Sequence, residues 1–270
     1  MKRGAAAAKL NLALVVGPAR PDGKHEVATV YQRIALTDDI EVRRAQRLDV
    51  TGFPADTLVA RALAELTANG GPRLAARIEK RIPVAAGLGG GSADAGAALR
   101  LGNALRPEPL PPERLHEIAR NLGADVPFFL SDGPQLGTGD GSELMPVDLP
   151  QDYWVLLVLP DDAAKSSTAS VYDAFDGRNG AEGFADRRRA LLEALRTVRR
   201  PRDLASLPPN DLASSPIAAE LRELGAFRAD VTGAGPTVYG LFLHRAAATQ
   251  AESRVARHGR TWLTAPAWYV

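Results

Sequence analysis

A glycine-rich stretch over residues 83–94 constrains the fold of this chain more than any other feature. Its sequence is Pro-Val-Ala-Ala-Gly-Leu-Gly-Gly-Gly-Ser-Ala-Asp, with four glycines among the five residues 87–91. Because ordering glycine costs more chain entropy than ordering other residues, this cluster indicates a backbone that needs conformations other residues avoid. Ser92 follows the glycines and is a favourable helix N-cap. The stretch therefore predicts a loop that ends where a helix begins.

The segments on either side of this loop are typical of a strand and a helix. Residues 74–81 alternate with the period of a half-buried strand, and residues 95–105 are rich in Ala and Leu without an internal proline. The free N–H groups and the dipole at a helix N-terminus attract anions. We therefore expect a phosphate-binding loop, with a tight turn that binds no ligand as the alternative. Lys80 lies on the inward phase of the strand, where it either contacts a nucleotide or extends to the surface.

Two better-known phosphate-binding motifs are excluded. The P-loop ends in Gly-Lys-Ser/Thr, whereas this loop ends in Gly91-Ser92-Ala93 and has no lysine at that place. The Rossmann fingerprint requires a third glycine three positions after the second. Counted from Gly87 and Gly89, that position is Ser92.

Four further polar residues stand out, each with two interpretations. Lys9 and Asn11 share the polar face of an alternating segment over residues 9–16, about 7 Å apart at strand geometry. They either hold an anionic or polyhydroxyl substrate or face solvent on an edge strand. Asp125 precedes an apolar turn that begins with proline, and local sequence favours an N-cap role for it. His25 follows the turn at residues 20–23 and on its own is more typical of a surface residue than of a ligand.

Composition bounds the class of protein. The chain has 270 residues, 45% hydrophobic, a formal net charge of +1 and no cysteine. This size allows one large or two small domains with a sizeable core, and a composition shift near Pro150 divides the chain into residues 1–150 and 151–270. Without cysteine there are no disulfides, thiolate metal sites or thiol nucleophiles.

The same quantities limit the partners that we expect. The near-neutral charge gives no support for nucleic-acid binding, so the arginine run over residues 187–202 predicts a solvated helix face. The apolar runs are shorter than the roughly 18–20 residues of a membrane span. Lys9 and Asn11 interrupt the alanines at positions 5–8 before a signal-peptide core forms. We expect a soluble cytoplasmic protein, monomeric or weakly dimeric, with no membrane or nucleic-acid partner.

Taken together, several short segments resemble the GHMP kinase family, the small-molecule kinases named for galactose, homoserine, mevalonate and phosphomevalonate. The resemblance is closest to members that act on a cytidine-diphosphate polyol in the non-mevalonate isoprenoid pathway. It implies an α+β, two-domain GHMP kinase fold with an N-terminal α/β ATP-binding domain containing a left-handed βαβ unit, a C-terminal ferredoxin-like domain and an active site between them. The segments that carry it are residues 8–12, 20–25, 87–92, 123–127, 137–139, 167–169, 210–212 and 232–236.

The resemblance also implies roles for individual residues. Asp125 would take the proton from the substrate hydroxyl, and Lys9 would hold Asp125 ionised and orient that hydroxyl. Ser92 would bind Mg²⁺ together with the phosphates of ATP. The implied nucleotide-binding residues are Lys80, Pro83, Val84, Ala85, Ala86, Gly87, Leu88, Gly89, Gly90, Gly91, Ser92 and Ala93, and the implied substrate-binding residues are Asn11, His25, Thr168, Tyr172, Thr232 and Gly233.

The chain departs from the family pattern at three positions. Lys24 replaces a tyrosine whose ring stacks on the substrate's cytosine, and losing such a stack costs roughly 1–3 kcal/mol. Ala93 replaces the second serine of the loop, and Thr57 replaces an asparagine near the adenine. Two alternatives therefore stay beside a kinase for the cytidine-diphosphate polyol: a family kinase for another alcohol, and a non-catalytic nucleotide-binding relative. Lys9, Asp125 and Ser92 together argue against the second alternative, because a protein without catalysis needs none of them.

Overall fold

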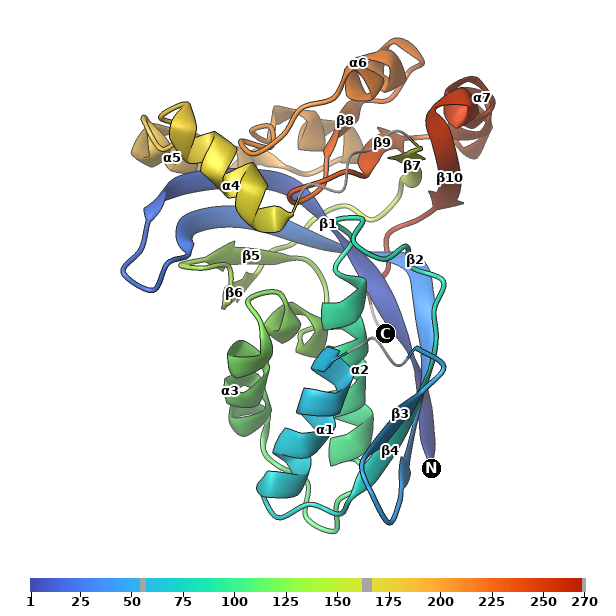
Figure 1. The fold of residues 1–270 in the computed structure, drawn as a ribbon. Coiled ribbons are helices and arrows are strands. Elements are labelled where there is room, and N and C mark those ends of the chain that lie inside the picture. The colour runs from blue at the N-terminus through green and yellow to red at the C-terminus, as the bar shows by residue number, and fades with distance from the viewer. Residues whose placement is uncertain (54–56, 162–166, 269–270) are drawn as a thin grey trace.

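The computed structural model describes residues 1–53, 57–161 and 167–268, which build two β-sheets with helices packed on them (Figure 1). The first sheet is organised around a long antiparallel hairpin of β1 (Lys2–Ala19) and β2 (His25–Arg44). Residues 6–17 of β1 are buried on both faces of the strand, rather than on one face as the alternation over residues 9–16 predicts. The reason is that the second sheet and α5 (Phe184–Thr197) cover the face that would otherwise meet solvent.

The remaining strands of the first sheet pair along the other edge of β2. β4 (Leu74–Glu79) pairs with residues 39–44, and β5 (Gln135–Thr138) pairs with residues 29–31 and with β6 (Glu143–Pro146). Apolar residues in the sequence predict separate strands at residues 27–36 and 41–50. The structure corrects this, because β2 runs through both as one continuous strand and is followed by the short β3 (Asp49–Thr51). β3, α1 (Thr57–Ala68) and β4 form a parallel βαβ unit, whose left-handed sense stays a prediction. The apolar spacing over residues 55–69 predicts a helix there, and its expected first residue, Ala55, lies outside the described residues.

Three helices and a short 3₁₀ helix cover one face of this sheet. They are α1, α2 (Gly90–Asn103), α3 (Pro112–Leu122) and η1 (Val126–Leu130), which Figure 1 shows grouped beside β3 and β4. Buried leucines from α1 and α2, such as Leu63 and Leu99, pack with Phe128 of η1 into one core. Gly102 lets α2 pack closely against α1, because a Cβ there would lie only 2.6 Å from the Leu66 side chain.

The second sheet has the strand order of a ferredoxin-like domain. β7 (Trp154–Pro160), β8 (Arg228–Val231), β9 (Val238–Phe242) and β10 (Gly259–Thr264) are antiparallel in the order β10-β7-β9-β8. α6 (Pro216–Glu223) and α7 (Arg245–Val255) cover one face, and η3 (Ala256–His258) leads into β10. α4 (Thr168–Gly177), α5 and η2 (Pro201–Ser206) lie between β7 and α6 in the chain.

The end of the chain returns to the first sheet. The Ala35 N–H donates to the Ala265 carbonyl at 2.9 Å, and the Ala267 N–H donates to the Arg33 carbonyl at 2.9 Å. The buried Arg33 side chain also donates to the Trp268 carbonyl at 3.1 Å. This segment occupies the edge of β2 between β4 and β5. The first sheet ends at Pro146 and the second begins at Trp154, and the division at residue 150 stays a prediction.

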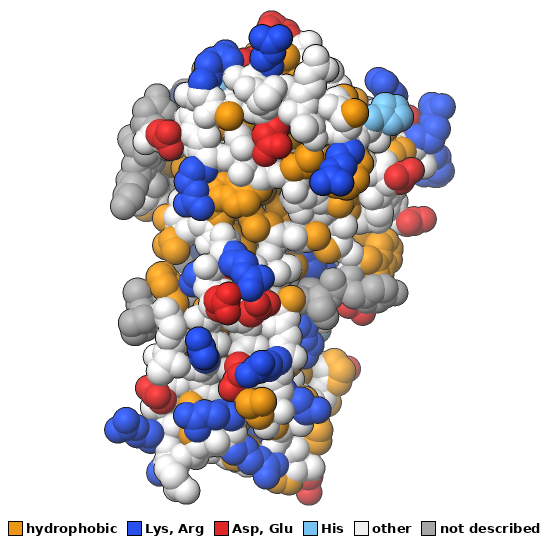
Figure 2. Space-filling model, turned by 90° about the vertical axis from the view of Figure 1, so that its right-hand side faces the viewer, with side chains coloured by type: hydrophobic (Ala, Val, Ile, Leu, Met, Phe, Trp, Pro, Cys, Tyr) orange, Lys and Arg blue, Asp and Glu red, His pale blue; other side chains and the backbone are white. Residues whose placement is uncertain are grey.

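The surface agrees with a chain of balanced charge. On the face shown in Figure 2, acidic side chains lie among the lysines and arginines. Within the arginine run, Arg188 and Arg189 are exposed on α5, whereas Arg187 turns inward and donates to Asp211 at 3.0 Å and to the Val16 carbonyl at 3.1 Å. The solvated-face prediction is therefore wrong for Arg187. Across the described ranges, every helix is too short or too polar to cross a bilayer.

Candidate active site

A cleft of about 480 Å³ lies where the two sheets meet. It is bounded by β1 and β2, the glycine loop, the segment before η1, the start of α4 and the loop after β8. The expected site residues that line it are Lys9, Asn11, Ala85, Gly87, Gly89, Ser92, Asp125, Thr168, Tyr172 and Gly233. Residues from distant parts of the chain thus meet in one cleft.

The glycine loop adopts the left-handed backbone conformations that its glycines were expected to allow. The φ angles of Ala85, Gly87 and Gly89 are 56°, 78° and 69°, all in the left-handed region. Helix α2 begins at Gly90 with Gly89 as its N-cap, so the prediction that Ser92 caps the helix is wrong. The first helical hydrogen bond runs from the Ala93 N–H to the Gly89 carbonyl at 2.8 Å. The three N–H groups before it, on residues 90–92, are therefore placed to bind an anion.

Gly87 is where the glycine loop meets the second domain. A Cβ at this position would lie 2.5 Å from the Thr232 carbonyl oxygen and 2.8 Å from the Gly235 carbonyl oxygen. Real Cβ atoms do not approach backbone oxygens this closely, so only glycine fits without moving one of the two loops. The glycine here serves a contact between domains as well as a turn.

A second pocket, of about 280 Å³, lies on the other side of the glycine loop. It is lined by Phe53, Leu58, Lys80 and residues 83–92, and it shares Ala85, Gly87, Gly89 and Ser92 with the cleft. A ligand in this pocket therefore reaches the cleft across the loop. Ala93 is buried within α2 and lines neither pocket, unlike the other expected nucleotide-binding residues. Phe53 was missed by sequence reasoning, since it precedes α1 in a segment with no motif.

Lys80 supports the stem of the loop. Its Nζ donates to Asp38 Oδ2 at 2.6 Å and to Asp94 Oδ2 at 2.8 Å, and both carboxylates are buried. Burial by itself lowers the pKa of Lys80, but the hydrogen bonds to these carboxylates outweigh it, and the pKa is raised. Asp38 also accepts the Ile82 N–H at 2.8 Å, which fixes the chain as it enters the loop. Contact between Lys80 and a nucleotide stays a prediction.

Lys9 and Asp125 form the charged centre of the cleft. Lys9 Nζ lies 3.7 Å from Asp125 Oδ2, and it donates to Asn11 Oδ1 at 2.6 Å and to the Gly87 carbonyl at 3.1 Å. The Lys9 side chain is 5% exposed and that of Asp125 is 33% exposed, so the carboxylate can meet a ligand. Burial lowers the pKa of Lys9, and Asp125 offsets part of this shift. Lys9 and Asn11 thus face the site although β1 is an edge strand, because the glycine loop and Thr232 cover that edge.

Asp125 has a second partner that the sequence analysis missed. The Tyr31 hydroxyl donates to Asp125 Oδ1 at 3.0 Å, so the carboxylate turns into the cleft although it precedes η1 at the N-cap position. Burial raises the pKa of Tyr31 well above its usual value, and Asp125 adds to this, so the hydroxyl remains a donor. Gly137 and Gly141 leave room for this ring, since their Cβ atoms would lie 2.6 Å and 2.7 Å from Tyr31 atoms. The glycine-rich stretch at residues 137–141 was the sequence signal that could have led to Tyr31.

Tyr172 lines the cleft, and His25 packs against its ring without lining the cleft itself. The rings of His25 and Tyr172 lie 4.6 Å apart at 30°, and His25 Nε2 lies 2.9 Å from Asp176 Oδ1. The His25 side chain is 8% exposed, so the expectation of a surface residue from local sequence is wrong. Burial raises the pKa of Tyr172 to about 12. Thr168 begins α4, whose N-cap Ser167 accepts the Ser170 N–H at 3.1 Å.

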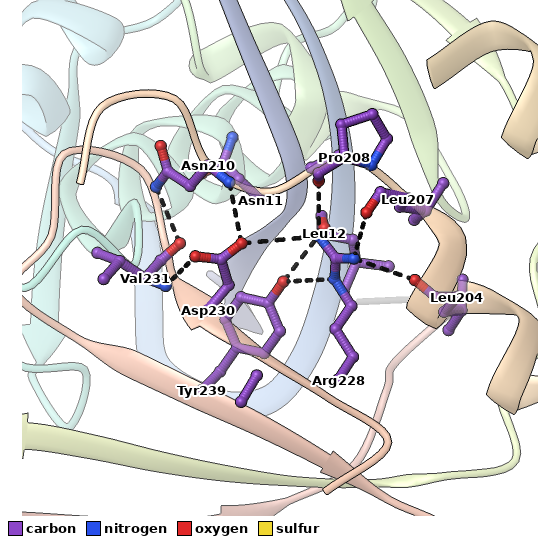
Figure 3. Close-up of polar contacts among 12 residues, drawn as sticks. Asn11, Leu12, Leu204, Leu207, Pro208, Asn210, Arg228, Asp230, Val231 and Tyr239 are labelled. Atoms are coloured by element: carbon purple, nitrogen blue, oxygen red, sulfur yellow. Dashed lines mark hydrogen bonds and ion pairs between the residues drawn. The ribbon is translucent and has the colours of Figure 1, made fainter. Parts of the chain in front are cut away.

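The loop after β8 is held against the cleft by Asn210. Its Nδ2 donates to the Val231 carbonyl at 2.9 Å and to the Gly233 carbonyl at 2.7 Å (the Val231 bond is drawn in Figure 3). Thr232 is fully buried and its hydroxyl accepts the Asn11 N–H at 3.1 Å. Gly233 lies beside Lys9, since a Cβ there would be 3.3 Å from Lys9 Nζ. Thr232 therefore supports Asn11 from behind, whereas Gly233 faces the cleft.

A buried arginine anchors the same region from below. Arg228 donates to the carbonyls of Leu204, Leu207 and Pro208 at 3.2, 2.6 and 2.8 Å. Its Nε donates to the Tyr239 hydroxyl at 3.1 Å, and that hydroxyl donates to the Leu12 carbonyl of β1 at 3.2 Å. Figure 3 shows these side chains converging beneath β1. The network ties the second sheet to the strand that carries Lys9 and Asn11.

Comparison with known proteins agrees with this arrangement. The family model described as GHMP kinases N terminal domain matches residues 57–133, and the model described as GHMP kinases C terminal matches residues 189–261. The chain is 40% identical over 268 residues to 4-diphosphocytidyl-2-C-methyl-D-erythritol kinase of Anaeromyxobacter sp. (strain Fw109-5), covering 93% of this chain and 85% of the relative. It is 38% identical over 266 residues to the protein of the same name from Moorella thermoacetica, covering 92% of each chain.

A solved structure of a protein of this kind matches nearly the whole chain. The crystal structure of 4-(cytidine 5'-diphospho)-2C-methyl-D-erythritol kinase matches with a TM-score of 0.78 at 30% identity. The match covers 98% of this chain and 99% of that chain. Both sheets and the cleft between them therefore fall within the shared architecture.

Proposed function

The chain belongs to the GHMP kinase family, and from this premise we propose that it transfers the γ-phosphoryl group of ATP to the 2-hydroxyl of 4-diphosphocytidyl-2-C-methyl-D-erythritol. The reaction is a step of the non-mevalonate isoprenoid pathway. The observation that carries the proposal is the glycine loop shared by two pockets, with Lys9 and Asp125 on the side of the larger one.

ATP would occupy the smaller pocket. Phe53, Leu58 and the exposed Val84 offer apolar contacts for a base, and the N–H groups of residues 90–92 offer donors for phosphate oxygens. Phosphoryl transfer requires mainly alignment and neutralisation of charge, which fixed backbone donors supply without rearranging. Because the two pockets share Gly87, Gly89 and Ser92, the terminal phosphate would lie at the border of the cleft.

The residues present fit Mg²⁺ carried by the nucleotide. In the described parts of the chain, no cluster of three or more histidine, cysteine or carboxylate side chains is arranged to hold a metal ion. Mg²⁺ in kinases is held through substrate phosphates, waters and one or two protein oxygens, and the Ser92 hydroxyl borders both pockets. When bound, the ion would neutralise charge on the phosphates.

The acceptor hydroxyl would lie against Asp125. Asp125 would take its proton, while Lys9 and Tyr31 fix the two carboxylate oxygens by contacts at 3.7 and 3.0 Å. Asn11 would orient the polyol, since its amide is held between Lys9 Nζ and the Thr29 hydroxyl. His25 and Tyr172 would form the wall for the cytosine, with Thr168 beside them at the start of α4. The monomeric or weakly dimeric state and the cytoplasmic location stay predictions.

The test is ADP release by the purified protein with ATP and Mg²⁺ and one alcohol at a time. We expect turnover with 4-diphosphocytidyl-2-C-methyl-D-erythritol, and turnover at the level of the alcohol-free blank with mevalonate, homoserine and free methylerythritol. Turnover with another alcohol in place of the cytidine compound would contradict the substrate and favour a kinase whose specificity has changed at Lys24. Absence of turnover with every alcohol, while ATP still binds, would contradict the kinase activity.

A further inference from the structure

The mouth of the cleft carries an ion pair between two turns. Lys24 ends the turn between β1 and β2, and its Nζ donates to Asp140 Oδ2 in the turn between β5 and β6. The two side chains are placed differently. Asp140 lines the cleft and its side chain is 14% exposed, whereas Lys24 is 49% exposed and stands outside the lining.

The Asp140 carboxylate is fixed near the reacting groups. Its Oδ1 accepts the Ser142 N–H at 3.1 Å. The next residue, Gly141, packs against the Tyr31 hydroxyl, which in turn donates to Asp125. Burial by itself would raise the pKa of Asp140, but the hydrogen bonds from Lys24 and Ser142 lower it, so the group is charged at neutral pH. A fixed negative charge therefore faces the cleft on the side of Asp125.

The charges around the cleft then do not balance without Lys24. Among the residues that the structure describes, the lining contains one cation, Lys9, and two carboxylates, Asp125 and Asp140. A substrate with a diphosphate group is itself an anion. Like charges facing each other in a partly enclosed site repel, and the repulsion decreases as salt screens it.

We propose that Lys24 and Asp140 together form a specificity-determining charge pair, in which Lys24 cancels the Asp140 charge and so lets the cleft accept a diphosphate-bearing substrate. The proposal rests on the proposed function, because that function supplies the diphosphate. It assigns to Lys24 a role through Asp140 rather than a direct contact with the substrate. It also gives this chain a physical reason to have a lysine at this position.

The experiment is steady-state kinetics on wild type, Lys24→Met, Asp140→Asn and the double variant, with 4-diphosphocytidyl-2-C-methyl-D-erythritol as the varied substrate. At low salt we expect Lys24→Met to raise the KM for this substrate about fivefold with kcat unchanged. Asp140→Asn should lower the KM, and the double variant should return it to near the wild-type value. The differences should shrink in about 0.5 M salt, because the Debye length falls to a few ångströms.

Two controls separate a charge effect from a structural one. Lys2→Met removes an exposed lysine at the far end of β1 and should leave the KM unchanged. The KM for ATP should change less than that for the alcohol, because ATP would enter through the pocket on the other side of the loop. Equal melting temperatures would exclude a folding defect.

Each outcome decides between the claims. A raised KM for Lys24→Met that the second substitution does not restore would mean direct substrate contact by Lys24 and would overturn the charge-cancelling role. An unchanged KM would overturn the proposal altogether. If the wild-type protein did not phosphorylate the cytidine compound, this would contradict the proposed function and the diphosphate-bearing substrate on which the charge pair depends.

Discussion

Lys9 and Arg228 are two buried cations that the protein uses in opposite ways. Arg228 donates to three carbonyls and a tyrosine hydroxyl, so its planar fork is fully engaged in holding chain segments together. Lys9 donates to Asn11 and the Gly87 carbonyl, and keeps a longer contact of 3.7 Å to a carboxylate that a ligand can reach. Arg228 also lies 3.7 Å from a carboxylate, that of Asp230, but this side chain is only 12% exposed. A buried cation is therefore structural where its donors have protein acceptors and its neighbouring carboxylate is buried, and it is placed for chemistry where that carboxylate is partly exposed.

The largest expected effect is on kcat, when Asp125, the carboxylate beside Lys9, is replaced. Asp125→Asn removes the proposed base and should lower kcat by about 10²–10⁴-fold, the usual range for general base catalysis. The melting temperature should stay close to that of wild type, since the Asp125 side chain is 33% exposed and an asparagine oxygen can still accept the Tyr31 hydroxyl. Steady-state kinetics and thermal melts measure both quantities. Asp186→Asn, on the exposed surface of α5, is the control, and near-normal kcat in Asp125→Asn would exclude the base assignment.

The next largest effect is on the free energy of unfolding, when Arg228 is replaced. Arg228→Met leaves the carbonyls of Leu204, Leu207 and Pro208 without this donor and should lower the free energy of unfolding by about 3 kcal/mol. Well below the melting temperature, kcat should remain within about twofold of wild type. Urea denaturation and kinetics on the same sample test this. Arg228→Lys, which keeps the charge but loses the fork, should recover only part of the stability.

A loss of activity in Arg228→Met without loss of stability would break the comparison. It would mean that the network of Figure 3 acts on the reacting groups rather than holding the segments beneath β1 together.

A matched pair of glycines tests the contact between the two domains. Gly87 and Gly23 have φ angles of 78° and 79°, so alanine meets the same backbone strain of about 1–2 kcal/mol at both positions. A Cβ at Gly87 would also strike the Thr232 carbonyl, whereas a Cβ at Gly23 would have open space within 4 Å. We expect kcat/KM to fall about 10–100-fold for Gly87→Ala and to stay near wild type for Gly23→Ala. Equal losses would show that strain alone explains the effect.

The smallest effect is in the pH profile. Burial lowers the pKa of Lys9 below 10.5, so the ammonium deprotonates earlier than that of an exposed lysine. The rate should fall at alkaline pH with a midpoint below 10.5. In the window between the folded pKa and 10.5 the unfolded state binds more protons, so this group's contribution to folding stability rises with pH while activity falls.

The control for this profile keeps the charge at Lys9. Lys9→Arg should lack the alkaline limb at whatever rate it retains, because guanidinium stays protonated throughout the range. If the rate of Lys9→Arg fell at the same alkaline pH as that of wild type, the titrating group would be a residue other than Lys9.

Local patterns were sufficient for part of this molecule. The glycine cluster predicted a loop before a helix, and the alternation around Lys9 and Asn11 predicted a strand. The predicted start of the helix was wrong by three residues, because Gly89 in the left-handed region acts as the N-cap that Ser92 was expected to provide. Short-range chemistry does not decide between two good N-caps three positions apart.

The rest depends on contacts between distant segments. Tyr31 reaches Asp125 across 94 positions of the chain, and Tyr239 reaches Leu12 across 227. The return of residues 265–267 to β2 likewise depends on a gap between β4 and β5 that exists only in the folded sheet. Such pairings leave no periodicity in the sequence, and only the family resemblance pointed to the place where they meet.

The most direct test of the central claim is phosphorus NMR of the product that wild type forms from ATP, Mg²⁺ and 4-diphosphocytidyl-2-C-methyl-D-erythritol. We expect one new phosphomonoester resonance, an unchanged diphosphate pair on the cytidine compound, and ADP in equal amount. ADP accompanied by free phosphate, with the alcohol unchanged, would show hydrolysis in place of transfer and would contradict a cleft built to bring this hydroxyl to Asp125.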